Sequence, residues 1–262
     1  SGGSVGSVAA GVVTLSGTAG LSDVVATYAG SAGTAKLTVK LQGEAATPGV
    51  DLAKAAAQFA AAKPDAASAV PALEYPLPGV LLPSNLPAID AQWAKDGDST
   101  LYRVKLVASL VDLTVYTDKA ELAFPDAIWT AFKKSTVDQP ATIQVDGVGP
   151  KGLHAGKPQP IGVVSDPIPD SALYVWQNST ATFRVLDIVK GTDTLLPSDV
   201  PLGGSGTCVG CHRISRDGKR FSYTQTGPYL QVGTLAYDDT KKLFSSKAAP
   251  TASGFGTYAA FN

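Results

Sequence analysis

The chain has 262 residues, of which only 16% are charged, and its formal net charge is −1. A near-neutral chain lacks the excess of positive charge that is expected of a protein that binds nucleic acid or an anionic membrane. No apolar run approaches the ~18 residues that a transmembrane helix requires. With two cysteines, two histidines and no methionine, the sequence excludes a disulfide-dense scaffold, a four-cysteine zinc site and a multi-haem cytochrome.

The first part of the chain is predicted to be β-rich. Residues 1–10 are mostly glycine, serine, alanine and valine, and we expect them to form a flexible tether. Residues 11–46 contain short β-rich runs separated by Ser-Gly and Ala-Gly pairs, which indicates a small β unit. The clearest run, AKLTVKLQ at 35–42, alternates apolar residues with lysine and threonine as a half-buried strand does.

Residues 47–70 are rich in alanine and are predicted to be a helix or a linker. The helical stretch is 51–63, DLAKAAAQFAAAK, in which Asp51 can cap the first turn and Pro64 stops the last. A linker remains an alternative, because the apolar face offers little beyond alanines and Phe59.

Residues 71–149 show many short strands at regular spacing, which resembles an immunoglobulin or fibronectin-III sandwich. Residues 126–134, DAIWTAFKK, are expected to form one or two helical turns with a single apolar face. Residues 150–200 repeat the strand pattern, either as a second sandwich or as closing strands of the first. Asp96 and Asp98 fall in a turn-like cluster that we expect to be solvated. The tryptophans are expected in the sandwich core: Trp93, Trp129 and Trp176.

Three of the four cysteines and histidines fall within five residues, Cys208-Val209-Gly210-Cys211-His212. This C-x-x-C-H sequence is the attachment signature of c-type haem. Two thiols at this spacing can add to the two vinyl groups on one edge of a porphyrin, and the adjoining histidine can then reach the iron. A Cys208–Cys211 disulfide and half of a zinc site remain alternatives.

His154 is the only other imidazole in the chain, and no methionine is present to serve as the sixth iron ligand. It lies in a glycine- and proline-rich segment, GPKGLHAGKPQP, which we expect to be flexible enough to fold over a haem. We therefore expect bis-histidine ligation, with His212 proximal and His154 distal. The alternative is that His154 is a solvated loop residue and that another group, or none, fills the sixth position.

The run CVGCHRISRDGKRFSYT resembles a group of bacterial secreted β-propeller proteins of the TolB/WD40-like class. The segments EYPLPGVLLPSNLPAIDAQW, ALYVWQNSTATFRVLDI and TYAAFN resemble the same group, so the likeness covers roughly residues 72–262. The resemblance implies that residues 201–262 hold the haem loop and a first blade, with residues 215–219 as a hairpin turn. A propeller needs at least four blades, so we expect a truncated propeller or one completed by another chain.

The sequence thus predicts an all-β, extracytoplasmic, mono-haem c-type cytochrome that carries electrons and is not an enzyme. Covalent attachment of haem outside the cytoplasm implies a periplasmic, surface-anchored or extracellular protein. Its expected partners are redox proteins or neighbouring haem subunits, in a homo-oligomer or filament. The alternative function is a non-catalytic, immunoglobulin-like adhesive or structural surface protein, in which Cys208 and Cys211 form a disulfide or metal site.

Overall fold

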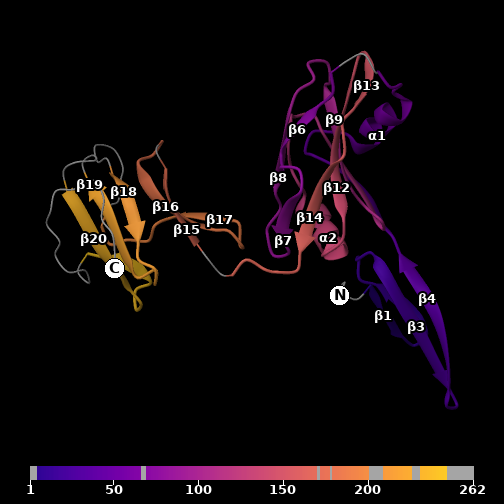
Figure 1. Cartoon of the computed structure of the whole chain (residues 1–262), viewed down its shortest axis with the longest axis horizontal. Coiled ribbons are helices and arrows are strands. Elements are labelled where there is room, and N and C mark those ends of the chain that lie inside the picture. Colours follow the sequence, from indigo (N-terminus) through magenta and orange to yellow (C-terminus); the bar gives the residue numbers. More distant parts are fainter. Residues whose placement is uncertain are drawn as a thin grey trace. The chain divides into compact units, whose positions relative to one another are not determined.

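The computed structural model describes six stretches of the chain and confirms the all-β prediction, with 55% strand and 10% helix. The chain divides into two compact units, unit 1 (Ser1–Ile168) and unit 2 (Pro169–Asn262), which are coloured by sequence in Figure 1. Within the described residues, no helix is both long and apolar enough to span a membrane. The described stretches are 5–65, 69–169, 172–177, 179–200, 209–225 and 231–246.

Unit 1 is built on a mixed seven-stranded sheet in which the central pairs are antiparallel. The outer pairs, β5 with β10 and β14 with β7, are parallel, and β13 pairs with β12 off the main path. In order across the sheet, the strands are β5 (Leu41–Ala46), β10 (Val111–Thr117), β9 (Leu101–Ala108), β12 (Ala141–Gly149), β14 (Gln159–Val164) and β7 (Val80–Pro83), with β13 (Gly152–Ala155) beside β12.

A second layer covers one face of this sheet and completes the core. It consists of helix α2 (Asp126–Thr136) and a three-stranded sheet of β11 (Glu121–Ala123), β8 (Asp90–Ala94) and β6 (Ala72–Tyr75). Trp129 and Phe132 from α2 and Trp93 from β8 are buried in one cluster with Val104 and Ile143 of the sheet. The helix confirms the apolar face predicted for residues 126–134.

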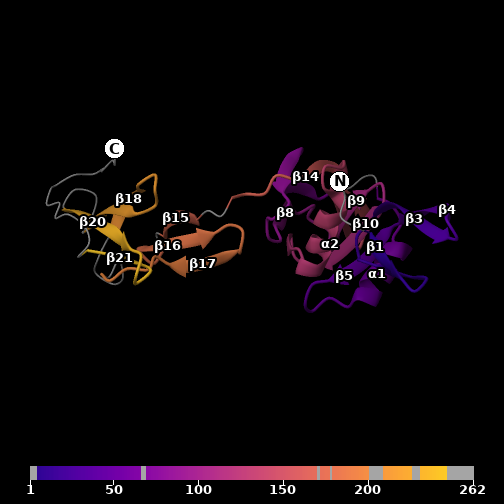
Figure 2. The same cartoon turned by 90° about the horizontal axis from the view of Figure 1, so that it is seen from below.

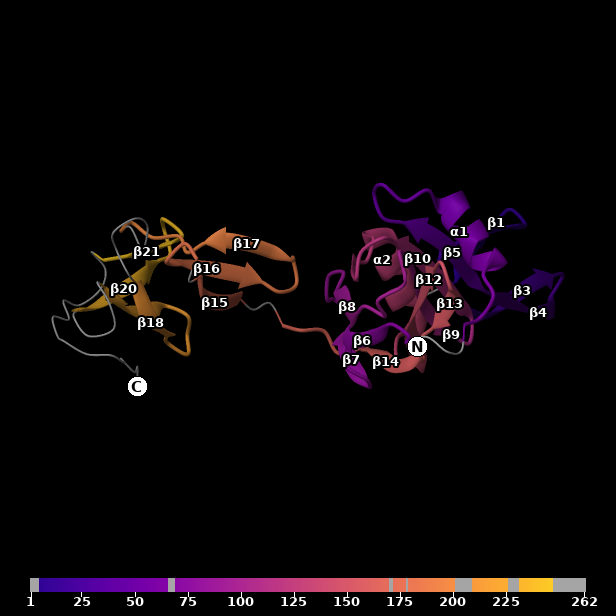
Figure 3. The ribbon, with the colours of Figure 1, turned by 90° about the horizontal axis from the view of Figure 1, so that it is seen from above.

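Helix α1 (Leu52–Ala61) confirms the helix predicted in the alanine-rich segment. The side chain of Asp51 caps it by accepting a hydrogen bond from the amide of Lys54 at 3.1 Å. Phe59 is its main buried anchor: the ring packs against Tyr116 with centroids 5.6 Å apart, and the guanidinium of Arg103 lies 4.7 Å above it. Figure 3 shows α1 beside β5 and β10, which agrees with these contacts.

The N-terminal arm, defined as residues 5–39, consists of two β-hairpins. The first joins β1 (Gly6–Ala9) to β2 (Val12–Leu15), so part of the expected tether is a strand. The second joins β3 (Gly20–Tyr28) to β4 (Ser31–Val39) and extends beyond the large sheet (Figure 2). The expected unit at 11–46 is therefore divided, because its last strand, β5, belongs to the large sheet.

The described residues of unit 2 form two antiparallel sheets that share a core of Phe183, Phe221, Leu235 and Phe244. The expected 150–200 unit is divided, because β13 and β14 join the sheet of unit 1 whereas β15 to β17 belong to unit 2. Trp176 is 39% exposed, so the prediction that it is a core residue is wrong. The sheets are β15 (Ala172–Gln177), β16 (Thr182–Asp187) and β17 (Thr192–Leu195), and β18 (Val209–Ile214), β19 (Arg220–Gln225), β20 (Gln231–Asp238) and β21 (Leu243–Ser245).

We predict that Phe132→Ala lowers the free energy of unfolding of unit 1 by about 3–5 kcal/mol, because it leaves a cavity in the core. Phe132 has no exposed surface, whereas Leu77 is 64% exposed and provides a matched control as Leu77→Ala. Urea unfolding followed by tryptophan fluorescence measures both variants. Equal losses in the two variants would contradict the core assignment.

Candidate functional site

The described part of the C-x-x-C-H motif lies in a β-bulge at the start of β18. Pairing with β19 shifts register between Gly210 and Arg213, so Cys211 and His212 together occupy the irregularity. Cys211 has a φ of 44°, in the left-handed region that non-glycine residues rarely adopt. A bulge turns side chains away from the regular alternation of a strand, and here it gives Cys211 partial exposure. Cys208 lies outside the described residues.

The imidazole of His212 lies against aromatic rings and bonds to a main-chain carbonyl. Its centroid is 5.8 Å from that of Phe221 in a stacked arrangement and 4.9 Å from that of Phe183 in an edge-on one. Nε2 lies 3.0 Å from the carbonyl oxygen of Tyr174. Because a carbonyl only accepts hydrogen bonds, this contact assigns the ring proton to Nε2.

This geometry tests whether the residues suit a covalently attached haem. A partly exposed thiol directly beside an imidazole provides the required donor types. The same imidazole can bind iron through Nε2 only if its hydrogen bond to the carbonyl of Tyr174 is broken. The donor set therefore fits the group, with one hydrogen bond exchanged for the iron bond.

His154 lies in strand β13, opposite Gly147 of β12, and not in a flexible loop as the sequence suggested. Its side chain has no exposed surface. Nδ1 lies 2.8 Å from Oδ2 of Asp96 and 3.1 Å from Oγ of Ser99. Nε2 faces two further carboxylates, each 3.6 Å away, and makes no hydrogen bond: Asp65 and Asp98.

The two histidines of the predicted iron site thus belong to different units. A distal ligand must present a ring nitrogen to the haem, whereas both nitrogens of His154 face carboxylates inside unit 1. Distal ligation by His154 stays a prediction, and it would require this strand to leave the interior.

Ser99, His154 and Asp96 bring together the residue types of a hydrolase triad, but not its geometry. In a triad the serine and the carboxylate bond to opposite ring nitrogens. Here Ser99 and Asp96 both contact Nδ1, and the serine hydroxyl also donates to Asp96 at 2.5 Å. The ring is closed to solvent, so this cluster is not a nucleophilic site.

The cluster around His154 holds together segments that are distant in the chain. Asp96 and Ser99 belong to the β8–β9 connection, Asp65 follows α1, and His154 comes from β13. Gly147 makes the close approach possible, because a Cβ there would overlap Ser99 and Asp96. No group of three or more His, Cys, Asp or Glu side chains among the described residues is arranged to hold a metal ion.

The side chain of Asp96 has no exposed surface, which corrects the expectation of a solvated turn. Burial acts to raise the pKa of this carboxyl, but hydrogen bonds outweigh it and lower the pKa below its ordinary value. The donors are the hydroxyl and amide of Ser99, the ring of His154 and the amide of Asp98. Asp96 is therefore held as a carboxylate by the local fold.

Sequence reasoning missed Tyr174, Phe183 and Phe221 around His212, and it missed Asp65, Asp96 and Ser99 around His154. Apart from Phe221, which lies on the adjoining strand β19, these partners come from strands and loops far along the chain, so spacing alone carries no signal for them. Comparisons with protein-family models, curated proteins and solved structures found no match to this chain. The chemistry of both sites therefore rests on the residues themselves.

We predict that Asp96→Asn makes the stability of unit 1 less sensitive to acid. With its folded pKa lowered, Asp96 contributes stability above its unfolded value of about 3.9, and this stability is lost as pH falls through the folded pKa. Urea unfolding between about pH 5 and pH 3 should show a smaller loss in the variant than in the wild type. The exposed carboxylate of Asp90 provides the control, Asp90→Asn, and an unchanged acid response in Asp96→Asn would refute the prediction.

Proposed function

We propose that the chain is an extracytoplasmic electron-transfer protein whose unit 2 carries one haem c. The haem would be attached through Cys208 and Cys211, with His212 as an iron ligand. The observation that carries the proposal is the bulge in β18, which places a partly exposed thiol beside an imidazole held by a main-chain carbonyl. A carbonyl hydrogen bond is weak enough, at about 1 kcal/mol net, to be exchanged for a metal bond.

When bound, the haem would supply a one-electron couple, and the chain would position it and set its surroundings. Two thioether links would fix the macrocycle, and His212 would orient the iron. Phe183 and Phe221 would form an apolar wall that excludes water from one side of the imidazole. Such exclusion lowers the local dielectric constant and disfavours the added charge of the oxidised iron.

We further propose that β18 to β21 form a propeller blade, as the family resemblance implies. Four antiparallel strands in sequential order are typical of a blade. The turn at 215–219 joins β18 to β19, and Asp217 accepts a hydrogen bond from the amide of Lys219 at 3.0 Å, beside Gly218 with φ of 71°. This turn chemistry is independent of the haem.

An immunoglobulin or fibronectin-III assignment for unit 1 has weaker support. Two layers with a shared core are sandwich-like. The parallel pairs β5–β10 and β14–β7 depart from the wholly antiparallel sheets of that fold.

The proposed partners are redox proteins or haem subunits of neighbouring copies, and no catalytic role is proposed. The second candidate is a haem-free surface protein in which Cys208 and Cys211 form a disulfide or metal site. The exposed N-terminal arm favours this candidate, because arms of this kind suit attachment to other chains.

Intact-mass measurement of protein from a host that attaches c-type haem tests the first candidate. We expect an adduct on the order of 600 Da and a pyridine haemochrome spectrum typical of haem c. The double variant Cys208→Ser/Cys211→Ser is the control and should lack both. A native mass lower by two hydrogens would show a disulfide and favour the second candidate.

Absorption and electron paramagnetic resonance spectra of two histidine variants separate the proximal from the distal ligand. His212→Ala should keep some covalent haem and lose the low-spin spectrum, because the proximal ligand is gone. His154→Gln replaces the imidazole that the sequence predicts as the distal ligand, and it should abolish the low-spin spectrum if that prediction holds. A low-spin spectrum unchanged by His154→Gln would show that another group fills the sixth position.

A further inference from the structure

The N-terminal arm buries almost none of its side chains. Its buried residues all lie near the end of the arm that adjoins the rest of unit 1, which we call the root: Val5, Thr18, Ala19 and Val39. Large apolar side chains along the second hairpin are exposed, namely Leu21 at 73%, Val25 at 60% and Tyr28 at 86%. An isolated two-stranded hairpin is marginally stable in water, because it buries too little to offset the entropy of ordering its residues.

The hairpin β3–β4 is long, regular and unprotected at both edges. Nine residue pairs run from Gly20–Val39 to Tyr28–Ser31 with no register shift. The turn residues Ala29 and Gly30 both have positive φ, at 48° and 83°, which matches the twist of a tight hairpin. In the described part of the chain, neither strand pairs with a third one. Natural edge strands are usually blocked by proline, bulges or several charges, and β3 and β4 have no proline or bulge.

The two-residue turn also determines which main-chain groups point outwards. The pair next to such a turn is hydrogen-bonded, and hydrogen-bonded pairs then alternate along the ladder. The other pairs direct their amides and carbonyls to the free edges. These outward residues are Leu21, Asp23, Val25 and Thr27 on β3, and Ala32, Thr34, Lys36 and Thr38 on β4.

Each free edge carries one charge, and the two charges are opposite. Asp23 is the only charged residue of β3, and Lys36 is the only one of β4. Two copies joined by like edges would bring two aspartates or two lysines together. Joining β3 of one copy to β4 of the next would instead place Asp23 opposite Lys36, in the register that already exists within the hairpin, where Nζ of Lys36 lies 3.8 Å from Oδ1 of Asp23.

We propose that the β3–β4 hairpin is an assembly element that pairs with the hairpin of a second copy of this chain. The outer edge of β3 adds to the outer edge of β4 of the next copy, as an antiparallel strand. This contact is head-to-tail, so each added copy leaves a free edge for another, and the assembly grows as an open sheet.

Side-chain packing across the new contact agrees with this register. Opposite residues of an antiparallel pair share a face, so Val24, Ala35 and Leu37 lie on the same face of the hairpin. Pairing between copies in the same register makes this apolar face continuous from one copy to the next. The opposite face, which also holds Leu21 and Val25, then carries alternating aspartate and lysine, which adds about 0.2–1 kcal/mol per opposite-charge pair.

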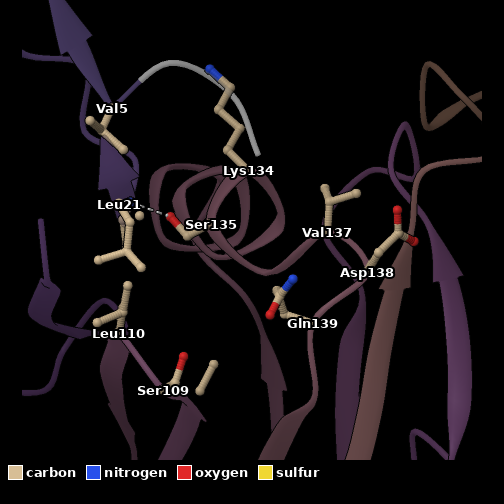
Figure 4. A pocket seen from close by; sticks show the side chains of 12 residues that line it. Val5, Leu21, Ser109, Leu110, Lys134, Ser135, Val137, Asp138 and Gln139 are labelled. Atoms are coloured by element: carbon tan, nitrogen blue, oxygen red, sulfur yellow. Dashed lines mark hydrogen bonds between the residues drawn. The ribbon is translucent and has the colours of Figure 1, made fainter. Parts of the chain in front are cut away.

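The root of the arm is attached to the rest of unit 1. The hairpin strands beyond the root are therefore accessible to a second copy. The amide of Ala19 donates to Oγ of Ser135 at 2.9 Å, and within the arm Val5 packs closely against Gly20. Beside these contacts, a cavity of about 310 Å³ separates the arm from the end of α2 and the β9–β10 turn (Figure 4). The proposed contact between copies uses no residue of the proposed haem site.

Sedimentation velocity and light scattering over a range of concentrations test the proposal. We expect wild-type protein to form species that grow beyond dimers as its concentration rises. The single variants Asp23→Lys and Lys36→Asp carry like charges on both edges, so each should associate about tenfold more weakly. Lys119→Asp, a reversal at an exposed lysine outside the arm, is the matched control and should behave as wild type.

A mixture of the two single variants is the decisive measurement. Each variant repels itself, but the lysine edges of one complement the aspartate edges of the other, so association should recover in the mixture. Growth at a wild-type level should also return in the double variant Asp23→Lys/Lys36→Asp.

Three outcomes would overturn the proposal: a wild type that stays monomeric, a closed dimer that does not grow, or a mixture that associates no better than its components. The Cys208→Ser/Cys211→Ser variant should assemble as wild type does. Failure of the haem proposal is therefore distinguishable from failure of this one.

Discussion

The ion pair between Arg103 and Asp146 joins the parts of unit 1 at its centre. Asp146 is 1% exposed, and its Oδ2 accepts from Nη2 of Arg103 at 2.7 Å. Its Oδ1 accepts from Gln144 and from the amide of Gly156, so both oxygens have partners. Because the guanidinium also covers Phe59, one buried charge links β9, β12, the start of the β13–β14 connection and helix α1.

A buried polar group must have partners, and the two histidines differ in the partners that surround them. His154 is surrounded by three carboxylates and a serine that hold it within unit 1. His212 is bonded to one carbonyl and otherwise lies against aromatic rings. A ring held by several charged groups is a structural element, whereas a ring held by one neutral acceptor can change partners. This difference is why we place the proposed iron ligand in unit 2.

Local patterns in the sequence predicted the elements whose cause is local. The alternation in 101–109, the cap at Asp51 and the apolar face of α2 all appear in the structure. The Asp217–Gly218 turn is local in the same sense. What could not be predicted depends on distant partners, because a fully buried histidine and a solvated one occur in similar short sequences. The burial of His154 follows from β12 and from the segments holding Asp65 and Asp96.

The parallel pairing of β5 with β10 gives the arm a mechanical property. Strand β4 ends at Val39 and β5 begins at Leu41, so the backbone runs from the exposed hairpin into the edge of the large sheet almost without interruption. Tension applied along the hairpin would load the six-residue ladder between β5 and β10 in shear. Its hydrogen bonds would then resist together instead of opening one at a time, and the arm would transmit force into the body of unit 1.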